Sequence, residues 1–463
     1  MSHRVHRCCV SVVTACVAAT LATSCARRPE RAALVFTGNM LGHIEPCGCS
    51  ENESGGLPRR HSYLQRVAER FESVLILDNG DLIGGASPQQ QTKLEFVVSG
   101  LGEMGYSAVN LGRRDMVFGV DLLRSLAAAV EFPLLSANLL PGDGDDADWP
   151  CKPFVVRELS VGGRNVRVAI VGVMSEQHAA SVVNVAPQAR VEPPTRVLRE
   201  LVPTLEGQAD FVILLAQMSD ADATALARDV TGLDVIICGQ GRHVPAEVER
   251  ANPGPRIFDT GNMGRYVATL ELALDANGKL AAKDFSFEII DKAFPKSKPM
   301  VELIREYRSV LAEEDLLGQL AQHAGRPRGG EFIGNEACGA CHVQDLALWR
   351  RSKHAHAYRT LARLGENKAF DPECVTCHVI GLGFQTGFVR WKQTPELGNV
   401  GCEACHGAGR EHAEQPLKPY NKSSEAFCRT CHDPDHSTHF DYKRDWALIK
   451  HGMEKIVRKG PQP

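Results

Sequence analysis

The chain has 463 residues, of which 43% are hydrophobic and 23% charged, and this balance excludes wholesale disorder as well as the collagen-like and coiled-coil classes. A net charge of −4 lacks the basic excess of a nucleic-acid binder, so no nucleic-acid partner is expected. The length predicts two or more domains, and the 16 cysteines and 17 histidines need a chemical explanation.

Residues 1–25 have the pattern of an export signal. Arg4 and Arg7 precede a short apolar stretch that is well under the ~20 residues of a membrane-spanning helix. The sequence L-A-T-S-C then ends at Cys25, which is predicted to carry a lipid; alternatively, cleavage near Ala26 discards this cysteine. Both interpretations place the protein in the periplasm or cell envelope, and the first adds a lipid anchor to the membrane.

Residues 30–294 alternate β-like runs with helical stretches, which predicts an α/β layered domain. The expected strands are A-A-L-V-F-T, S-V-L-I-L-D, Y-S-A-V-N-L-G, V-R-V-A-I-V-G-V, D-F-V-I-L-L-A and D-V-I-I-C-G. The expected helices cover residues 58–72, 121–130 and 194–205. Polar turns follow the strands, at the position where sites of this fold class gather.

The order of these turns resembles that of the calcineurin-like metallophosphoesterases, and of their 5'-nucleotidase branch in particular. The turns are T-G-N-M-L-G-H, L-D-N-G-D-L-I-G-G, N-L-G-R-R-D, I-L-L-A-Q-M-S-D and C-G-Q-G-R. The resemblance implies a fold whose active members hold two metal ions with Asp, His and Asn side chains and hydrolyse phosphate esters.

Most of that family's metal ligands are replaced in this chain. Asp81 remains at the position of the carboxylate that bridges the two metals. The other ligand positions hold Asn39, Met40 and Leu41 for Asp-x-His, Arg113 and Arg114 for Asn-His, Gln217 for His, and Gly239, Gln240, Gly241 and Arg242 for Gly-His-x-His. Because guanidinium groups also repel cations, the domain is predicted to be metal-free, and phosphoester hydrolysis is not expected.

The arginines among these replacements allow two interpretations. Guanidinium groups match phosphate and carboxylate oxygens, so Arg113, Arg114 and Arg242 are candidates for an anion pocket. The alternative is that they are solvated, or that they pair with Asp81 and Asp115.

A pair of cysteines, Cys47 and Cys49, follows the first of these turns. In an oxidising compartment such a pair is expected to form a disulfide, with each other or with Cys151 or Cys238. A redox-active or soft-metal-binding thiol pair is the alternative.

Residues 295–330 are predicted to be a helical linker between two domains. The stretch P-K-S-K-P breaks the structure near residue 297, a helix-like run covers residues 301–320, and G-R-P-R-G-G provides a flexible lead into the next segment.

Residues 331–456 carry four C-x-x-C-H motifs, and the stretch from residue 338 to the end holds eight of the 16 cysteines and ten of the 17 histidines. This motif denotes c-type haem attachment, in which both cysteines form thioethers and the adjacent histidine binds iron. The attachment residues are Cys338, Cys341, Cys374, Cys377, Cys402, Cys405, Cys428 and Cys431, and the proximal ligands are His342, His378, His406 and His432. Four covalently bound haems are therefore expected.

Distal ligands are expected among the remaining histidines of this segment: His354, His356, His412, His436, His439 and His451. The run from residue 332 to 452 resembles the tetrahaem cytochrome family whose best-known member accepts electrons from hydroxylamine oxidoreductase. The resemblance implies a mostly helical, haem-packed domain, with His354, His412 and His451 as distal ligands and room for one five-coordinate haem.

Together these features predict an exported multihaem cytochrome that transfers electrons between redox partner proteins. The nucleotidase-like domain would serve as a scaffold or as a thiol or anion site. Two alternatives remain at this stage. One is an active metallophosphoesterase or 5'-nucleotidase with an attached haem module, and the other is a haem or thiol oxidoreductase that acts on a small substrate.

Overall fold

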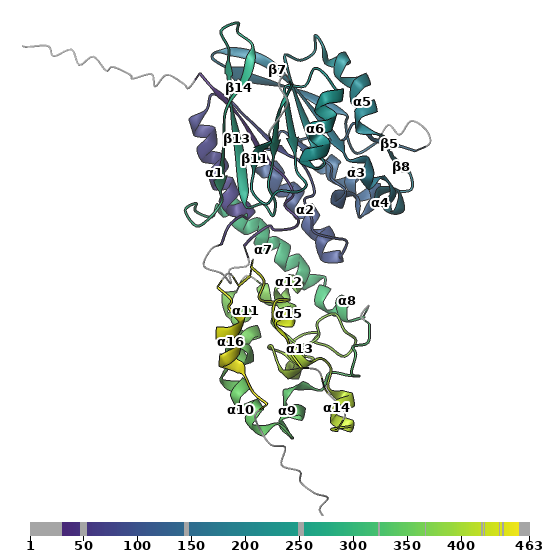
Figure 1. Cartoon of the computed structure of the whole chain (residues 1–463), viewed down its shortest axis with the longest axis vertical. Helices are drawn as coiled ribbons and strands as arrows, with labels where there is room; N and C mark the ends of the chain where they lie inside the picture. The colour runs from purple at the N-terminus through teal and green to yellow at the C-terminus, as the bar shows by residue number, and fades with distance from the viewer. Residues whose placement is uncertain are drawn as a thin grey trace, which may run out of the picture.

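The computed structural model describes residues 30–46, 53–142, 148–248, 254–322, 325–365, 367–417, 420, 422–434, 436–437 and 439–452. Two regions lie one after the other along the longest axis of the molecule (Figure 1). The amino-terminal region combines β-sheets with helices, and the carboxy-terminal region is helical, which confirms the predicted fold classes.

Two six-stranded sheets form the centre of the amino-terminal region. The first has the order β14 (Leu280–Ile289), β13 (Tyr266–Leu274), β1 (Ala32–Thr37), β2 (Val74–Asp78), β3 (Ala108–Asn110) and β4 (Leu134–Leu135). The second has the order β11 (Ala246–Val248), β12 (Arg256–Asp259), β10 (Val235–Cys238), β9 (Phe211–Gln217), β7 (Arg164–Met174) and β6 (Phe154–Val161). A separate pair joins β5 (Leu139–Pro141) to β8 (Ala189–Val191).

The central strands of the sheets are buried on both faces, which explains their nearly continuous apolar sequences. Along β1, Leu34 and Phe36 face the core between the two sheets, whereas Ala33 and Val35 face a core on the opposite side. That outer face is covered by the helices α1 (Leu57–Arg70), α2 (Pro88–Glu103) and α3 (Gly119–Ala129). The far face of the second sheet packs on α5 (Pro194–Leu201) and α6 (Asp220–Asp229), while α4 (Ala179–Val185) lies beside β8.

The strands β1, β2, β3 and β4 are parallel, and so are β7, β9, β10 and β12. Their carboxyl ends therefore bring the loops after Thr37, Asp78, Asn110, Gln217 and Cys238 toward one edge of the sandwich. The predicted polar turns occupy these loops, so the fold gathers them at one edge of the sandwich, and this group of loops is called the cleft below.

The segment predicted as a linker contains α7 (Lys298–Glu313) and α8 (Leu316–Gln322). Met300, Ile304 and Tyr307 on α7 are buried in the same core as α1 and α2, so this helix is packed onto the amino-terminal region. At the start of α8, Leu316 belongs to that core, whereas Leu317 belongs to the core of the carboxy-terminal region. This short helix joins the two regions.

The carboxy-terminal region consists of short helices connected by long loops. They are α9 (Gly334–Gly339), α10 (Val343–Arg351), α11 (Ala357–Leu364), α12 (Pro372–Val375), α13 (Cys402–His406), α14 (Arg410–Glu414), α15 (Glu425–Cys428) and α16 (Tyr442–Ile449). Among the described residues, its apolar core contains eight that are buried, including Tyr358, Val375 and Phe388. A core of this size stabilises little chain by itself.

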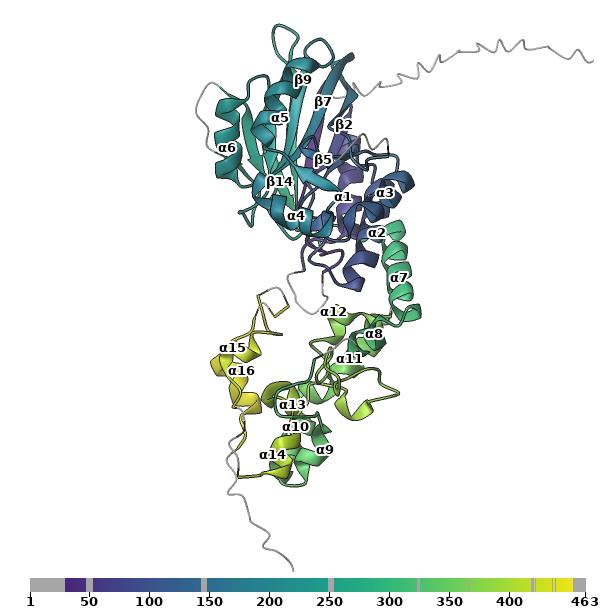
Figure 2. The same ribbon diagram turned by 90° about the vertical axis from the view of Figure 1, so that its right-hand side faces the viewer.

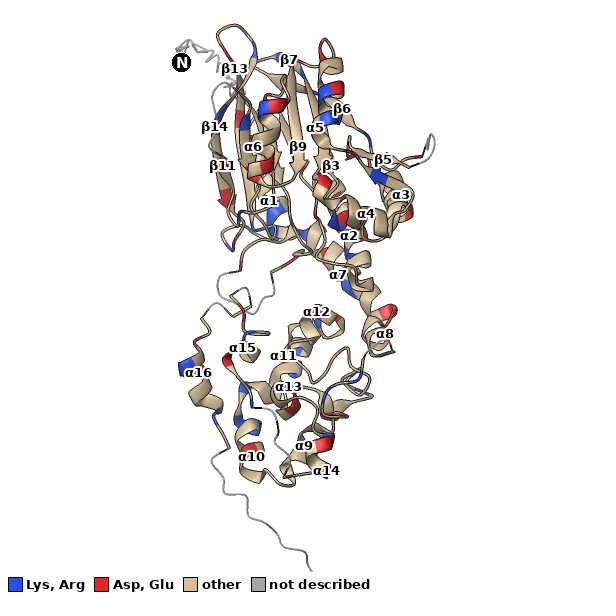
Figure 3. Ribbon diagram, turned by 45° about the vertical axis from the view of Figure 1, so that its right-hand side comes forward, with Lys and Arg blue, Asp and Glu red and all other residues tan. Residues whose placement is uncertain are grey.

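Basic and acidic side chains are interspersed over both regions (Figure 3). No helix in the described part of the chain is both long and apolar enough to cross a membrane.

Candidate functional site

Local hydrogen bonding folds the C-x-x-C-H motifs into single turns. In the first motif His342 N donates to Cys338 O over 3.0 Å, and in the fourth His432 N donates to Cys428 O over 2.9 Å. In the second motif His378 N donates to Val375 O over 2.8 Å. This winding places two thiols and one imidazole close together, as attachment of one haem requires.

The motifs lie next to one another in two pairs. The Cys338 and Cys402 side chains are hydrogen bonded, which joins the first motif to the third. Cys377 and Cys431 are likewise hydrogen bonded, which joins the second motif to the fourth. None of the eight attachment cysteines, all of which lie within the described residues, forms a disulfide.

Three motif histidines face the three histidines that the family resemblance assigned as distal ligands. The ring centres of His342 and His412 lie 6.2 Å apart. The corresponding distance is 6.0 Å for His354 and His432. It is 5.7 Å for the third pair, which is made by His406 and His451.

These distances match the width of a metal held between two imidazoles. A metal–nitrogen bond to histidine is about 2 Å long, so two opposed bonds and the rings themselves give roughly 6 Å between ring centres. The Nδ1 atom of His412 is buried without a hydrogen-bond partner, which suits a nitrogen that binds metal. The residues of the carboxy-terminal region therefore fit the haem groups that the motifs imply.

Neighbouring groups orient the imidazoles. His378 Nδ1 donates to Ala357 O over 2.8 Å, which leaves Nε2 as the nitrogen available to a metal. His432 Nδ1 lies 2.9 Å from Ser437 Oγ, and its ring stacks on Phe440 with 4.7 Å between centres. Burial lowers the pKa of both His354 and His432, and the charge of His432 lowers that of His354 further. Each effect favours the neutral imidazole that coordinates metals.

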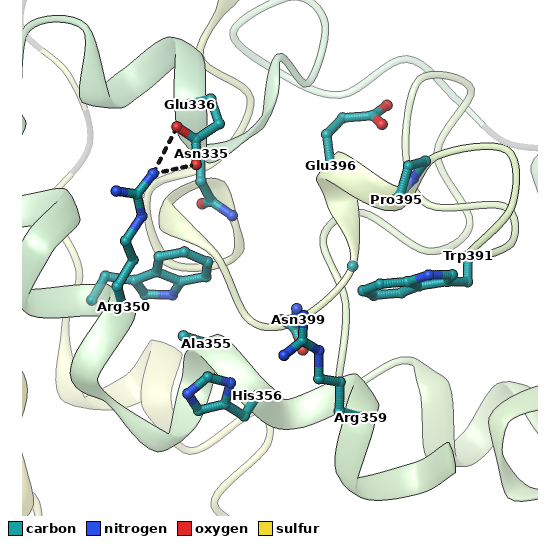
Figure 4. Close-up of a pocket in the computed structure, with 12 residues that line it drawn as sticks. Asn335, Glu336, Arg350, Ala355, His356, Arg359, Trp391, Pro395, Glu396 and Asn399 are labelled. Carbon is teal, nitrogen blue, oxygen red and sulfur yellow. Dashed lines mark hydrogen bonds and ion pairs between the residues drawn. The ribbon is translucent and has the colours of Figure 1, made fainter.

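The remaining candidate histidines lie in other surroundings. His356 lines an open cavity of about 370 Å³ together with Trp349, Trp391 and Arg359. Figure 4 shows the Arg350–Glu336 ion pair on one side of this cavity and Trp391 on the other. His436 pairs with Asp433 over 2.7 Å, and His439 is exposed.

Three non-glycine residues in the loops at the cleft have an unusual backbone conformation. Asn39, Leu41 and Asp81 adopt left-handed conformations with φ of 48°, 52° and 55°. Such conformations cost about 1–2 kcal/mol for non-glycine residues and gather at functional sites. A Cβ atom at Gly112 would lie 2.2 Å from Asp81 Oδ1, so this turn also requires glycine.

Amide side chains fill the positions where the related enzymes have metal ligands. Gln217 Nε2 donates to Asn39 Oδ1 over 3.0 Å and to Asn79 O over 3.2 Å. Asn39 Nδ2 in turn donates to Gly261 O over 3.2 Å. Within the described residues, no cluster of three or more His, Cys, Asp and Glu side chains is arranged to hold a metal ion. The residues present do not fit a two-metal centre.

Two of the three cleft arginines pair with carboxylates. Arg114 Nε lies 3.9 Å from Asp81 Oδ2, and its backbone N–H donates to Asp81 Oδ1 over 2.9 Å. Arg242 pairs with Asp220 over 2.8 Å. These contacts favour the interpretation that the arginines pair with carboxylates, although for Arg242 the partner differs from the two residues expected.

Burial raises the pKa of Asp81, while the nearby Arg114, Arg113 and His178 act in the opposite direction. His178, on the short turn Glu176–His178, was missed by the sequence analysis. Its Nε2 lies 2.9 Å from Gln240 Nε2, so it belongs to the cleft. His178 belongs to none of the motifs recognised in the sequence, so the sequence did not indicate that it lies at this site.

Cys151 and Cys238 are buried, and they belong to two different cores of the amino-terminal region. The predicted disulfide of Cys47 or Cys49 stays a prediction. Cys25, Cys47 and Cys49 lie outside the described residues.

Comparison with known proteins supports a division into two kinds of region. Residues 337–407 match the family described as cytochrome c554 and c-prime. The carboxy-terminal region is cytochrome c554-like. Cytochrome c-554 of Nitrosomonas europaea is 34% identical over 109 residues, which cover 21% of this chain and 45% of that protein. The cytochrome resemblance noted from the sequence is confirmed.

The amino-terminal region is similar to metallophosphoesterases. The trifunctional nucleotide phosphoesterase protein YfkN of Bacillus subtilis is 25% identical over 283 residues, which cover 52% of this chain and 19% of that protein. The crystal structure of a 5'-nucleotidase precursor from Thermus thermophilus superposes with a TM-score of 0.54 at 21% identity, covering 66% of this chain and 63% of the other. This second likeness concerns the fold alone. The chain spans less than half the length of the two curated relatives named here.

Proposed function

We propose that this protein transfers electrons through four covalently attached c-type haems. The observation that carries the proposal is the set of three opposed imidazole pairs, His342–His412, His354–His432 and His406–His451, each beside a C-x-x-C-H turn. When bound, c-type haem supplies a one-electron iron couple. Similarity to the cytochrome c554 family supports the same conclusion.

The chain contributes attachment, ligation and spacing. Each motif offers two thiols for thioether bonds and one imidazole for the iron. The contact between Cys338 and Cys402 brings the first and third attachment points together, and the contact between Cys377 and Cys431 does so for the second and fourth. Short separations of this kind favour electron transfer from one site to the next and onward to redox partner proteins.

We also propose that the protein is exported and carries a lipid anchor, as the pattern of residues 1–25 and the position of Cys25 indicate. We further propose that its regions span residues 30–294, 295–330 and 331–456. Intact mass measurement of the protein purified from membranes tests the anchor. A mature chain that begins with diacylated Cys25 is the expected result, and an unmodified chain that begins at or after Ala26 would exclude it.

The proposed function predicts how many electrons the protein accepts. In a coulometric titration of the purified full-length chain, we expect about four electrons per chain, since each haem accepts one. Fewer titratable electrons, or a protein without haem absorbance, would contradict the proposal.

A further inference from the structure

The second haem-attachment motif is held against the amino-terminal region by a buried charge. Lys93, on α2, is 1% exposed, and its Nζ lies 2.7 Å from both carboxylate oxygens of Glu373. Glu373 directly precedes Cys374, the first thiol of this motif. Both views of the molecule place α12, which contains these two residues, beside α7, where the two regions meet (Figures 1 and 2). The contact of α12 with α2 and α7 is called the junction below.

A second carboxylate of the same segment is held in the same way. Asp371 is 5% exposed and accepts a hydrogen bond from Gln89 Nε2 over 2.7 Å. Arg308, also 5% exposed, places its Nε 3.8 Å from Asp371 Oδ2. Asp371 also caps α12 by accepting a hydrogen bond from the Glu373 N–H over 3.0 Å. The amino-terminal region therefore fixes both the position and the start of the helix that carries Cys374.

The same contacts extend to the loops of the degenerate cleft. Gln90 Nε2 donates to Glu373 Oε1 over 2.7 Å, while its Oε1 accepts from Gly84 N over 2.8 Å. Arg114, which pairs with Asp81, donates to Gly84 O. Hydrogen bonds thus connect the cleft to the second attachment motif through two residues, Gly84 and Gln90.

A charge buried this deeply is unfavourable without its partner, so the junction is specific for this placement of the two regions. The charges of Lys93 and Arg308 also act on the neighbouring haem site at low effective dielectric. We propose that the amino-terminal region is a positioning and electrostatic support for the haem attached at Cys374 and Cys377, and that Lys93 raises the reduction potential of that haem. This inference rests on the proposed function.

The test is a Lys93→Met variant of the full-length holoprotein, compared with wild type by spectroscopically monitored potentiometry. Removing the Lys93 cation leaves the negative charge of the half-exposed Glu373 without its partner. The extra negative charge favours the oxidised state. We expect one component of the titration to move to a lower midpoint potential while the others stay in place.

The double variant Lys93→Met/Glu373→Gln removes both charges, and its potential is expected to return toward the wild-type value. A general loosening of the junction does not reverse in this way. Lys93→Gln, which keeps a hydrogen-bond donor, replaces the single variant if Lys93→Met does not fold. As a matched control, Arg350→Gln breaks the exposed Arg350–Glu336 pair beside the first motif, where solvent screens the charge.

Unchanged potentials in the single Lys93 variants, or a shift of every component, would overturn the inference. An equal shift of the same component in Arg350→Gln would also overturn it. Haem content measured on the same samples separates these outcomes from failure of the proposed function, because a protein without haem has no titrating component at all.

Discussion

The imidazole rings of His354 and His432 lie 6.0 Å apart at their centres, and Phe440 stacks on the ring of His432. Replacing His354 by alanine removes one axial ligand of the haem proposed at the fourth motif. We expect that haem to become high-spin and to bind carbon monoxide when reduced, which adds about one binding site per chain. Optical carbon monoxide titration and electron paramagnetic resonance measure the change.

The neighbouring His356→Ala variant is the control, because His356 is exposed and lines the open cavity instead of facing a motif histidine. Its spectrum should equal that of the wild type. If the two variants gave the same spectrum, His354 would not be a distal ligand.

The small apolar core of the carboxy-terminal region predicts that its folding depends on haem. Only eight residues form that core. The bound macrocycles must supply the remaining apolar contacts. In a variant with all eight motif cysteines changed to serine, we expect helix content from circular dichroism to fall while the sheet signal of the amino-terminal region persists. Unchanged helix content would contradict this account.

The packing of α7 onto the amino-terminal region should weaken in acid because of Glu45, which pairs with Arg308 of this helix. Burial raises the pKa of this carboxyl, but the charges and hydrogen bonds of Arg308 and Lys296 outweigh burial and lower the pKa to about 2. A folded-state pKa below the unfolded value contributes stability above the unfolded pKa. That contribution, roughly 3 kcal/mol, is therefore expected to disappear as the pH falls from about 4.5 to about 2.

Urea unfolding as a function of pH measures this effect. A Glu45→Gln variant should be less stable than wild type at pH 7 and should lose less stability between pH 4.5 and 2. Identical slopes for the two proteins over this interval would show that Glu45 is not the group responsible.

The amide side chains of the cleft predict that the protein does not hydrolyse phosphate esters. Gln217 and Asn39 are hydrogen bonded to each other where the related enzymes place metal ligands. Loss of even one residue that supports a metal ligand lowers metal affinity or activity about 10–100-fold. With manganese added, hydrolysis of AMP or of a chromogenic phosphodiester should equal the buffer rate, while a 5'-nucleotidase with its ligands intact is active in parallel. Turnover that is abolished by Asp81→Asn would restore the enzyme alternative.

Periodicity predicted much of the amino-terminal fold because its strands are buried on both faces. The run A-A-L-V-F-T coincides with β1, and the helix expected at residues 58–72 is α1, Leu57–Arg70. In the segment expected as a helix at residues 194–205, the α-helix ends at Leu201, and a short 3-10 helix, Val202–Leu205, follows it.

Helix α2 was not predicted, because its buried face carries polar residues such as Gln89, Gln90 and Lys93. These side chains are satisfied by Asp371 and Glu373, and 280 residues separate Lys93 from Glu373 along the chain. Local sequence contains no signal for such a contact. The C-x-x-C-H motifs are different, since all the residues that attach one haem lie within five consecutive positions and can be recognised from the sequence. The histidine ring pairs join distant residues, so they can be found only from the fold or from a family resemblance.

The central claim is that this chain carries four haems and no hydrolytic metal centre. A pyridine haemochrome assay combined with metal analysis on one purified sample of the full-length protein tests it most directly. The account predicts about four haems per chain, in keeping with one haem for each C-x-x-C-H motif, and no stoichiometric transition metal beyond haem iron. Fewer haems, or two bound manganese or zinc ions per chain, would contradict it.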